Sequence, residues 1–293
     1  MPKIFLSDKL QDYFVEFDYS PKNRENGSLD GEVLKAFEDG KCIYFKNWIV
    51  DFDKDFFANL NLKENREAKK LKSDLAADGT IDPVLLKRQL EQCVKDDATA
   101  DEFPVQAEHV VAQVAPIMNR VFKGHVYHER RATWRMLDTL HENLHIDVYS
   151  DEKSDVQLRM FVNLDIVPRI WHTGYSLEDL LEKFGHLLTD DELANIGPTA
   201  LCKLLNQRVY GSFANAGKDG QPRHTAFFGP GEVWMVDSRR VAHQIFFGRR
   251  ALSLDYFATP ESMGDPSKYY LRSVEEYRQS RGFDRALKEK FVA

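Results

Sequence analysis

The sequence predicts an α+β protein in which helices flank a barrel-like double β-sheet. Residues 1–125 have a mostly helical pattern, whereas residues 126–260 contain several short β-prone segments separated by turns. Two of these segments, residues 144–149 and 158–165, alternate between an aliphatic side and a polar or aromatic side. This alternation suits the strands of a double sheet whose interior holds a site.

We expect the 293 residues to form a single domain with three parts. Residues 1–125 are expected to be a mostly helical part that packs on the sheet, and residues 126–260 to form the β core. A helical insertion over residues 176–206 interrupts this core, and residues 261–293 form a C-terminal helical tail.

The N-terminal part contains one clear amphipathic helix. Its apolar stripe ends near Gly124 and is expected to pack on the sheet. The stripe consists of Val110, Val111, Val114, Ile117, Met118 and Val121. Upstream, we expect a strand over residues 41–45, after Gly40, and a turn at Asp82-Pro83.

The strands expected in the β core are short runs rich in β-branched and aromatic residues. They are residues 131–135, 144–149, 158–165, 232–236, 241–247 and 251–257. Ser176 and Thr189 each precede an acidic residue by three positions, a capping-box pattern that opens the helices of the insertion. Residues 211–220 are expected to form a flexible stretch that contains several glycines.

The Gly248-Arg249 pair predicts a two-residue hairpin turn between the last two strands. Glycine stands first, as a type II′ turn requires. In that hairpin Phe247 pairs with Arg250, which places Arg250 on the same face as His243.

The most specific chemical signal is the pair His145-x-Asp147, with His243 much later in the chain. Residues i and i+2 of a strand point to the same side, so this pair offers an imidazole and a carboxylate to one ion, which His243 completes from another strand. Two histidines and one carboxylate leave three positions of an octahedral ion open, as in non-haem Fe(II) oxygenases. His141 and His172 remain alternative third ligands.

The same segment contains a competing motif, H-E-x-x-H, formed by His141, Glu142 and His145. On a helix this motif places two zinc ligands on one face, with Glu142 as the general base of a metallohydrolase. Some helical spacing is present, but the strict alternation over residues 144–149 is the stronger pattern and favours a strand. The sequence therefore favours iron, and it leaves open both zinc and the alternative that His145 and His243 are structural histidines.

Composition argues against several classes of protein. Cys42, Cys93 and Cys202 are far apart in the chain, which indicates a reducing compartment and no cysteine-bound metal. The N-terminus lacks a signal-peptide pattern, and no apolar run approaches the ~18 residues that a membrane span needs. The net charge of −7 argues against nucleic-acid binding. We therefore expect a soluble cytoplasmic protein.

An oxygenase that uses 2-oxoglutarate needs a cation for the distal carboxylate, and the planar guanidinium of arginine matches it best. Arg159 is the preferred candidate because it lies on the polar side of a strand close to the iron motif, with Asn163 as a neighbouring donor. Arg250 is the alternative, at about 13 Å along the expected hairpin from His243.

Seven short motifs, in this order along the chain, carry a family resemblance: residues 40–45, 132–135, 144–147, 158–163, 168–171, 231–234 and 242–243. Together they resemble the Fe(II)/2-oxoglutarate-dependent Kdo hydroxylases, which hydroxylate C3 of 3-deoxy-D-manno-octulosonic acid (Kdo) in the lipopolysaccharide inner core. The likeness extends over about residues 35–270 and is strongest over residues 131–175. One departure is His172, where the family usually has an arginine.

The resemblance implies a jelly-roll core of the double-stranded β-helix (cupin-like) type with flanking helices. It assigns Fe(II) to His145, Asp147 and His243, with 2-oxoglutarate and O2 as cosubstrates and Kdo on a lipid A precursor as the substrate. Another small-molecule 2-oxoglutarate oxygenase and the zinc metallohydrolase remain the alternatives.

An anionic sugar on a phosphorylated lipid is expected to contact cations and aromatic rings. The candidates for these contacts are Arg131, Trp134, Arg135, Arg169, Trp171 and His172. Residues 281–290 are basic, which suits either a peripheral contact with the anionic inner-membrane surface or a solvated terminal helix.

Overall fold

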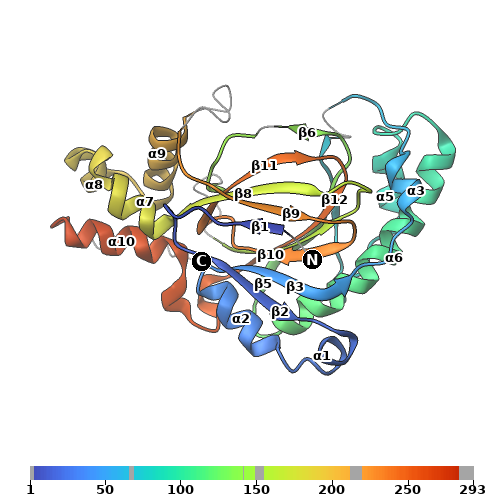
Figure 1. Cartoon of the computed structure of the whole chain (residues 1–293), viewed down its shortest axis with the longest axis horizontal. Helices are drawn as coiled ribbons and strands as arrows, with labels where there is room; N and C mark the ends of the chain where they lie inside the picture. Colours follow the sequence, from blue (N-terminus) through green and yellow to red (C-terminus); the bar gives the residue numbers. More distant parts are fainter. Residues whose placement is uncertain (1–2, 66–68, 141, 149–154, 212–219, 284–293) are drawn as a thin grey trace.

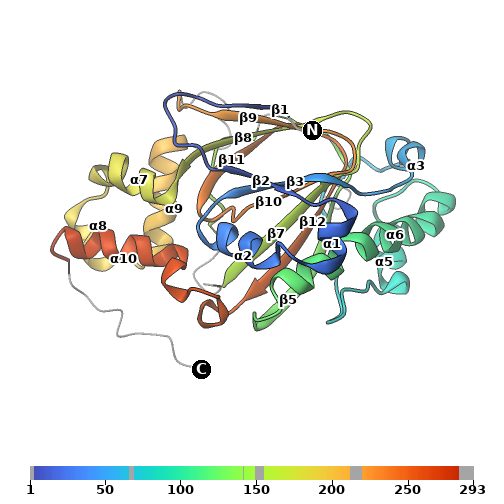
Figure 2. The ribbon, with the colours of Figure 1, turned by 60° about the horizontal axis from the view of Figure 1, so that its bottom comes forward.

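The alternating segments form two β-sheets that face each other as a double-stranded β-helix, the predicted fold class. The structure, a computed structural model, describes residues 3–65, 69–140, 142–148, 155–211 and 220–283. Figures 1 and 2 show the two sheets at the centre, with one group of helices on either side.

The larger of the two sheets, the major sheet, has seven strands in the order β2-β3-β10-β7-β12-β5-β4. Its neighbouring strands are antiparallel except for β2 and β3, which run parallel. The strands are β2 (Phe14–Asp18), β3 (Cys42–Ile49), β4 (Leu71–Asp74), β5 (Tyr127–Arg135), β7 (Val156–Asn163), β10 (Glu232–Met235) and β12 (Ala251–Ala258).

The minor sheet has five strands in the order β1-β9-β8-β11-β6. They are β1 (Lys3–Phe5), β6 (Thr139–Leu140), β8 (Arg169–Ser176), β9 (His224–Phe228) and β11 (Val241–Gly248). The chain crosses repeatedly between the sheets, and aromatic side chains from both meet in the space between them. Phe161 of the major sheet and Trp171 of the minor sheet have ring centroids 5.3 Å apart.

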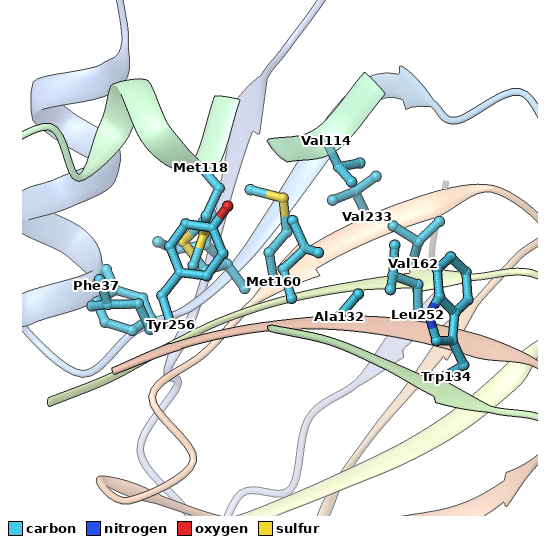
Figure 3. Close-up of a cluster of buried hydrophobic side chains, with 14 of the residues drawn as sticks. Phe37, Val114, Met118, Ala132, Trp134, Met160, Val162, Val233, Leu252 and Tyr256 are labelled. Atoms are coloured by element: carbon cyan, nitrogen blue, oxygen red, sulfur yellow. The ribbon is translucent and has the colours of Figure 1, made fainter. Parts of the chain in front are cut away.

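Helix α6 (Asp97–Val121) covers the outer face of the major sheet, and all six residues of its predicted apolar stripe are buried. Figure 3 shows Val114 and Met118 of this helix above a row of sheet side chains that includes Met160 and Val162. The other N-terminal helices are α1 (Pro21–Asn26), α2 (Asp30–Glu38), α3 (Lys54–Ala58) and α5 (Pro83–Leu90). The prediction that a helix packs on the sheet is confirmed.

The predicted helical insertion is also present, and both of its capping patterns form. Ser176 Oγ accepts a hydrogen bond from the Asp179 amide at 3.0 Å, and Thr189 makes a reciprocal capping box with Glu192. The helices in and beside the insertion are α7 (Leu177–Phe184), η1 (Gly185–Leu187), α8 (Asp190–Asn195), α9 (Pro198–Tyr210) and, after the short turns η3 (Pro260–Ser262) and η4 (Pro266–Lys268), α10 (Tyr270–Ser280). Residues 212–219 of the expected flexible stretch and residues 284–293 of the tail lie outside the described residues.

The description of residues 1–125 as mostly helical with one early strand is wrong in part. This region supplies β1, β2, β3 and β4 to the two sheets. Three of these strands have only three to five residues, too few for a period of two to stand out from chance. Strands β8 and β9 were likewise not predicted.

The expected hairpin at Gly248-Arg249 is wrong. Strand β11 pairs with β8 and β6 in the minor sheet, whereas β12 pairs with β5 and β7 in the major sheet. A type II′ turn also needs a positive φ at its first central residue, and Gly248 does not have one. The segment therefore carries the chain from one sheet to the other, and Arg250 is not placed beside His243.

Trp134 is a core residue and does not line the space between the sheets. It is 1% exposed, its ring centroid lies 5.3 Å from that of Phe103 on α6, and its Nε1 donates to Ser73 Oγ at 3.1 Å. Since side chains alternate along β5, Thr133 and Arg135 face the interior while Trp134 faces the helices. The expected contact of Trp134 with a sugar is thereby corrected.

We predict that Trp134→Ala lowers the free energy of unfolding by about 3–5 kcal/mol, because it removes a large buried ring and leaves a cavity under α6. Urea denaturation followed by circular dichroism measures this value. Val105→Ala on the same helix is the control: Val105 is 58% exposed, so the expected change is within about 0.5 kcal/mol. Similar small changes in both variants would contradict the packing described for Trp134.

Candidate metal centre

His145 and His243 meet across an isolated antiparallel bridge. The His145 amide donates to the His243 carbonyl at 3.0 Å, and the His243 amide donates back at 2.8 Å. The Asp147 amide then donates to the Ser238 carbonyl at 2.9 Å. Instead of the strand expected over residues 144–149, the structure has this one bridge at His145. The side chains of the described residues 144–148 still point alternately to opposite sides.

The side chains of His145, Asp147 and His243 converge on one point. One ligand atom from each lies within 4.8 Å of the others. His145 Nε2 is 3.5 Å from Asp147 Oδ1, and His243 Nε2 is 3.9 Å from Asp147 Oδ2. Atoms that bind one ion at about 2 Å are separated by distances of this order. The structure therefore brings together the three predicted metal ligands.

Backbone carbonyl groups fix the orientation of both imidazole rings. His145 Nδ1 lies 2.8 Å from the Asn143 carbonyl, and His243 Nδ1 lies 3.3 Å from the Val241 carbonyl. A carbonyl oxygen only accepts, so each Nδ1 donates and each neutral ring carries its lone pair on Nε2. This arrangement of a ligating histidine is typical of metal sites in proteins.

The ionisation of two ligands also suits a cation. Burial, together with the charge of His145, lowers the pKa of His243 to about 3, so this ring is neutral at physiological pH. Burial alone would raise the pKa of Asp147, but the charge of Arg159 and the hydrogen bond to His145 hold it well below its ordinary value. Against the effect of burial, Asp147 raises the pKa of His145, so protons compete with a metal for this ligand.

The zinc-hydrolase alternative requires a helix, and the described residues 142–148 are not helical. The Glu142 amide instead donates to the Ile245 carbonyl at 3.1 Å, which continues the extended pairing beside β11. The Glu142 side chain lies 3.9 Å from Arg135. His141 lies outside the described residues. The geometry in which Glu142 would serve as the general base is therefore not formed.

A cavity between the two sheets opens beside the three ligands. Its remaining lining residues are Lys70, Arg135, Glu142, Arg159, Phe161, Arg169, Trp171, Ile245, Ala251, Leu252 and Ser253. Four of them are cations, and burial with the neighbouring charges of Arg135 and Arg159 lowers the pKa of Lys70 to about 8. Such a cavity favours an anionic ligand.

Arg169 is a buried cation at the wall of this cavity. It is 3% exposed, and its Nη1 has no hydrogen-bond partner among the described residues. Burial, followed by the charge of Arg135, lowers its pKa to about 9. Gly248 gives the guanidinium its space, because a Cβ there would lie 2.3 Å from Arg169 Nη1. An incompletely paired buried guanidinium is costly unless a ligand completes its contacts.

Arg159 lines the cavity, but its hydrogen bonds point to protein groups. Its Nη1 donates to Asp147 Oδ2 at 2.5 Å and to Ser238 Oγ at 3.0 Å, and its Nε donates to Asp255 Oδ1 at 2.8 Å. These contacts couple Arg159 to a metal ligand and do not favour its expected role as the anchor of a cosubstrate.

Asn163 and Arg250 do not line the cavity, which corrects their expected place beside a cosubstrate. Asn163 donates both amide hydrogens to the carbonyl groups of Val167 and Phe228, each at 2.9 Å. Arg250 points the other way and donates through Nε to the Phe57 carbonyl at 3.1 Å. Asn163 thus connects the loop at Val167 to β9, and Arg250 contacts helix α3.

His172 and Arg131 also lie away from the cavity, whereas Arg135, Arg169 and Trp171 line it. His172 Nδ1 is 2.7 Å from Gln244 Oε1 on the outer side of the minor sheet, because side chains alternate along β8. Arg131 donates to Glu129 at 2.7 Å. The expected contacts of His172 and Arg131 with a substrate in this cavity are therefore corrected.

Lys70, Ser238 and Asp255 are among the residues of the site that the sequence analysis did not predict. Asp255 carried a signal, since it is the one charged residue in the mostly apolar run Ala251–Ala258, and burying a charge requires a partner. Ser238 and Lys70 carried none, because turns and loops are commonly polar. Their places depend on contacts between segments far apart in the chain.

Neither a known sequence family nor a curated protein sequence matches the chain. Solved structures do match. One of them is the Kdo hydroxylase KdoO, a non-heme Fe(II) alphaketoglutarate dependent dioxygenase, in complex with succinate and Fe(III). It superposes with a TM-score of 0.69 and 14% sequence identity, and the match covers 96% of this chain and 100% of that chain. Its complex with alphaketoglutarate and Fe(III) has a TM-score of 0.67 and 15% identity, over 97% and 100% of the two chains. The apo structure has a TM-score of 0.66 and 14% identity, over 97% and 100%. This likeness shows the fold.

We predict that His145→Ala, Asp147→Ala and His243→Ala each abolish the binding of one equivalent of Fe(II) or Co(II). A site with three protein ligands that loses one retains too few bonds to hold the ion. Anaerobic isothermal titration calorimetry measures the binding. Glu142→Gln is the control, and it should bind the metal as the wild type does. Loss of binding in Glu142→Gln with normal binding in Asp147→Ala would contradict the assignment of the ligands.

Proposed function

We propose that this protein is an Fe(II)/2-oxoglutarate-dependent dioxygenase that hydroxylates C3 of Kdo linked to a lipid A precursor. The observation that carries the proposal is the convergence of His145, Asp147 and His243 at the wall of a cationic cavity. Three ligands on one side leave three positions of an octahedral ion for a chelating cosubstrate and O2. The shared fold with KdoO over nearly the whole chain supports the substrate.

Iron and cosubstrate supply the oxidising power that an unactivated methylene such as C3 of Kdo requires. His145, Asp147 and His243 would hold the iron, with two imidazoles and one carboxylate as the donor groups. Trp171 packs against His243, with ring centroids 5.3 Å apart, and excludes water from that side of the ligand. The protein thus positions and protects the reacting groups.

Arg169 is the proposed anchor of the distal carboxylate of 2-oxoglutarate. It lies on the same side of β8 as Trp171 and Thr173, and Thr173 is the register partner of His243. The distance along the strand from Arg169 to Thr173 is about 13 Å, which the cosubstrate and an arginine side chain together can bridge. Arg169 Nη1 has no hydrogen-bond partner within the described part of the chain, which supports this role over that of Arg159, whose guanidinium is bound to carboxylates.

Arg135 and Lys70 are the proposed contacts for the carboxylate of the sugar. Both line the cavity, and among the described residues Lys70 has no ion-pair partner within 4.0 Å. His172 points to the outer side of the minor sheet. It occupies the position at which the Kdo hydroxylases that the chain resembles usually have an arginine. The departure from the family at this position therefore does not alter the lining of the cavity.

We further propose that the protein acts in the cytoplasm, with Kdo-lipid A precursor as its partner at the inner-membrane surface. The chemistry of a lipid-linked substrate supports this place, and the net charge of −7 argues against a nucleic-acid partner. Over the part of the chain that the structure describes, none of the helices is both long and apolar enough to cross a membrane.

We predict that Arg169→Ala raises the KM for 2-oxoglutarate tenfold or more, because the loss of a charged hydrogen bond costs about 1.5–3 kcal/mol. Gly248→Ala should raise this KM as well, since its Cβ would displace the guanidinium. Steady-state oxygen consumption with varied 2-oxoglutarate measures both. Arg249→Ala, which removes an ion pair with Asp165 next to Gly248, is the control and should leave the KM unchanged. An unchanged KM in Arg169→Ala would place the anchor elsewhere.

The direct test of the proposed function is incubation with Fe(II), 2-oxoglutarate, O2 and Kdo-bearing lipid A precursor. We expect succinate to form and the sugar to become heavier by one oxygen atom, as read by mass spectrometry of the released Kdo. Asp147→Ala is the control and should give neither product. Succinate formation with an unchanged Kdo mass would retain the oxygenase and reject the substrate, in favour of another small molecule.

A further inference from the structure

We propose that Arg159 and Ser238 bind one oxygen of Asp147 and thereby leave only the other oxygen for the metal, and that Asp255 balances the charge of Arg159. This inference rests on the proposed metal site and assigns to it three positioning residues. None of the three is required to touch the metal.

The two donors meet on the same atom of Asp147. Arg159 Nη1 donates to Oδ2 at 2.5 Å, and Ser238 Oγ donates to Oδ2 at 2.8 Å. The other oxygen, Oδ1, lies 3.5 Å from His145 Nε2, which is shorter than the 3.9 Å that separates Oδ2 from His243 Nε2. The Ser238 carbonyl also accepts from the Asp147 amide at 2.9 Å, so the same turn fixes both the backbone and the side chain of this ligand.

Arg159 is itself held by a buried carboxylate. Arg159 and Asp255 are register partners on the neighbouring strands β7 and β12, they are 5% and 1% exposed, and Nε donates to Oδ1 at 2.8 Å. Asp255 also accepts from Thr133 Oγ1 at 2.6 Å and from Ser253 Oγ at 2.7 Å. A buried ion pair with these additional hydrogen bonds keeps the guanidinium in one place.

The arrangement matters for the number of open positions on the metal. A carboxylate that binds through both oxygens occupies two positions, and it would leave too few for a chelating cosubstrate and O2. Hydrogen bonds to Oδ2 restrict Asp147 to one metal bond. Without Asp255, the charge of Arg159 would repel the cation at short range, so the carboxylate behind it preserves the affinity for metal.

The test measures Co(II) binding, with the visible absorption of the bound ion as the second readout. Arg159→Met combined with Asp255→Asn removes the donor without changing the net charge, and we expect the Kd for Co(II) to rise about 10- to 100-fold with an altered spectrum. Ser238→Ala, a change of one oxygen atom, should give a smaller rise. Asp255→Asn alone should also weaken Co(II) binding, because the positive charge of Arg159 then has no buried carboxylate to offset it.

The matched control is Lys46→Met combined with Glu16→Gln. These residues form an ion pair of 3.0 Å on β3 and β2 of the same sheet, and neither has a described contact with Asp147, Arg159, Ser238 or Asp255. This control should bind Co(II) with the Kd and spectrum of the wild type. Thermal unfolding of the metal-free variants detects a purely structural role, which would lower stability without altering the cobalt spectrum.

An unaltered Kd and spectrum in both Arg159→Met/Asp255→Asn and Ser238→Ala, with normal metal binding by the wild type, would overturn this inference and leave the proposed function intact. A wild-type protein that binds no divalent metal would overturn both. If the double variant does not fold, Ser238→Ala and Asp255→Asn alone decide the question by the same two readouts.

Discussion

The site depends on the antiparallel bridge between His145 and His243. Two backbone hydrogen bonds, of 3.0 and 2.8 Å, fix a short extended segment against the first part of β11. With that pairing set, the period of two along the segment turns Asp147 to the same side as His145. This one contact therefore determines the relative positions of all three proposed metal ligands, and the rest of the fold keeps both partners in place.

The interior wall of the major sheet is unusual because it carries buried charge. Arg159 and Asp255 pair across β7 and β12, and Arg131 lies on the other side of Asp255 at 3.7 Å. Transfer of such groups from water costs several kcal/mol per ion, which their mutual attraction and added hydrogen bonds offset. Apolar replacements of buried ion pairs are often as stable as the pairs themselves, which is consistent with the role that we propose for these charges beside Asp147.

The crossing of the chain between the sheets shapes the cavity. At Gly248 the chain leaves the minor sheet, and the missing side chain provides the space that the Arg169 guanidinium occupies. The next residues, Arg249 and Arg250, are then directed to Asp165 and to the Phe57 carbonyl. The predicted hairpin would have placed Arg250 on the face of His243, whereas the crossing directs Arg250 away from the cavity. Arg169, whose Nη1 has no hydrogen-bond partner among the described residues, lies at the cavity wall instead.

The sequence by itself predicted the fold class, the helix of the apolar stripe, the capped insertion and the proposed ligands His145, Asp147 and His243. The helix and the shared side of His145 and Asp147 follow from short-range periodicity, and the insertion follows from its capping residues. The jelly-roll class and the assignment of iron follow from the motifs that carry the family resemblance. Periodicity does not indicate which side of a strand faces the space between the sheets, or which other strand pairs with it. Only the tertiary structure therefore decided that Trp134 is covered by a helix and that Arg159 is bound to Asp147, because these outcomes depend on contacts between segments far apart in the chain.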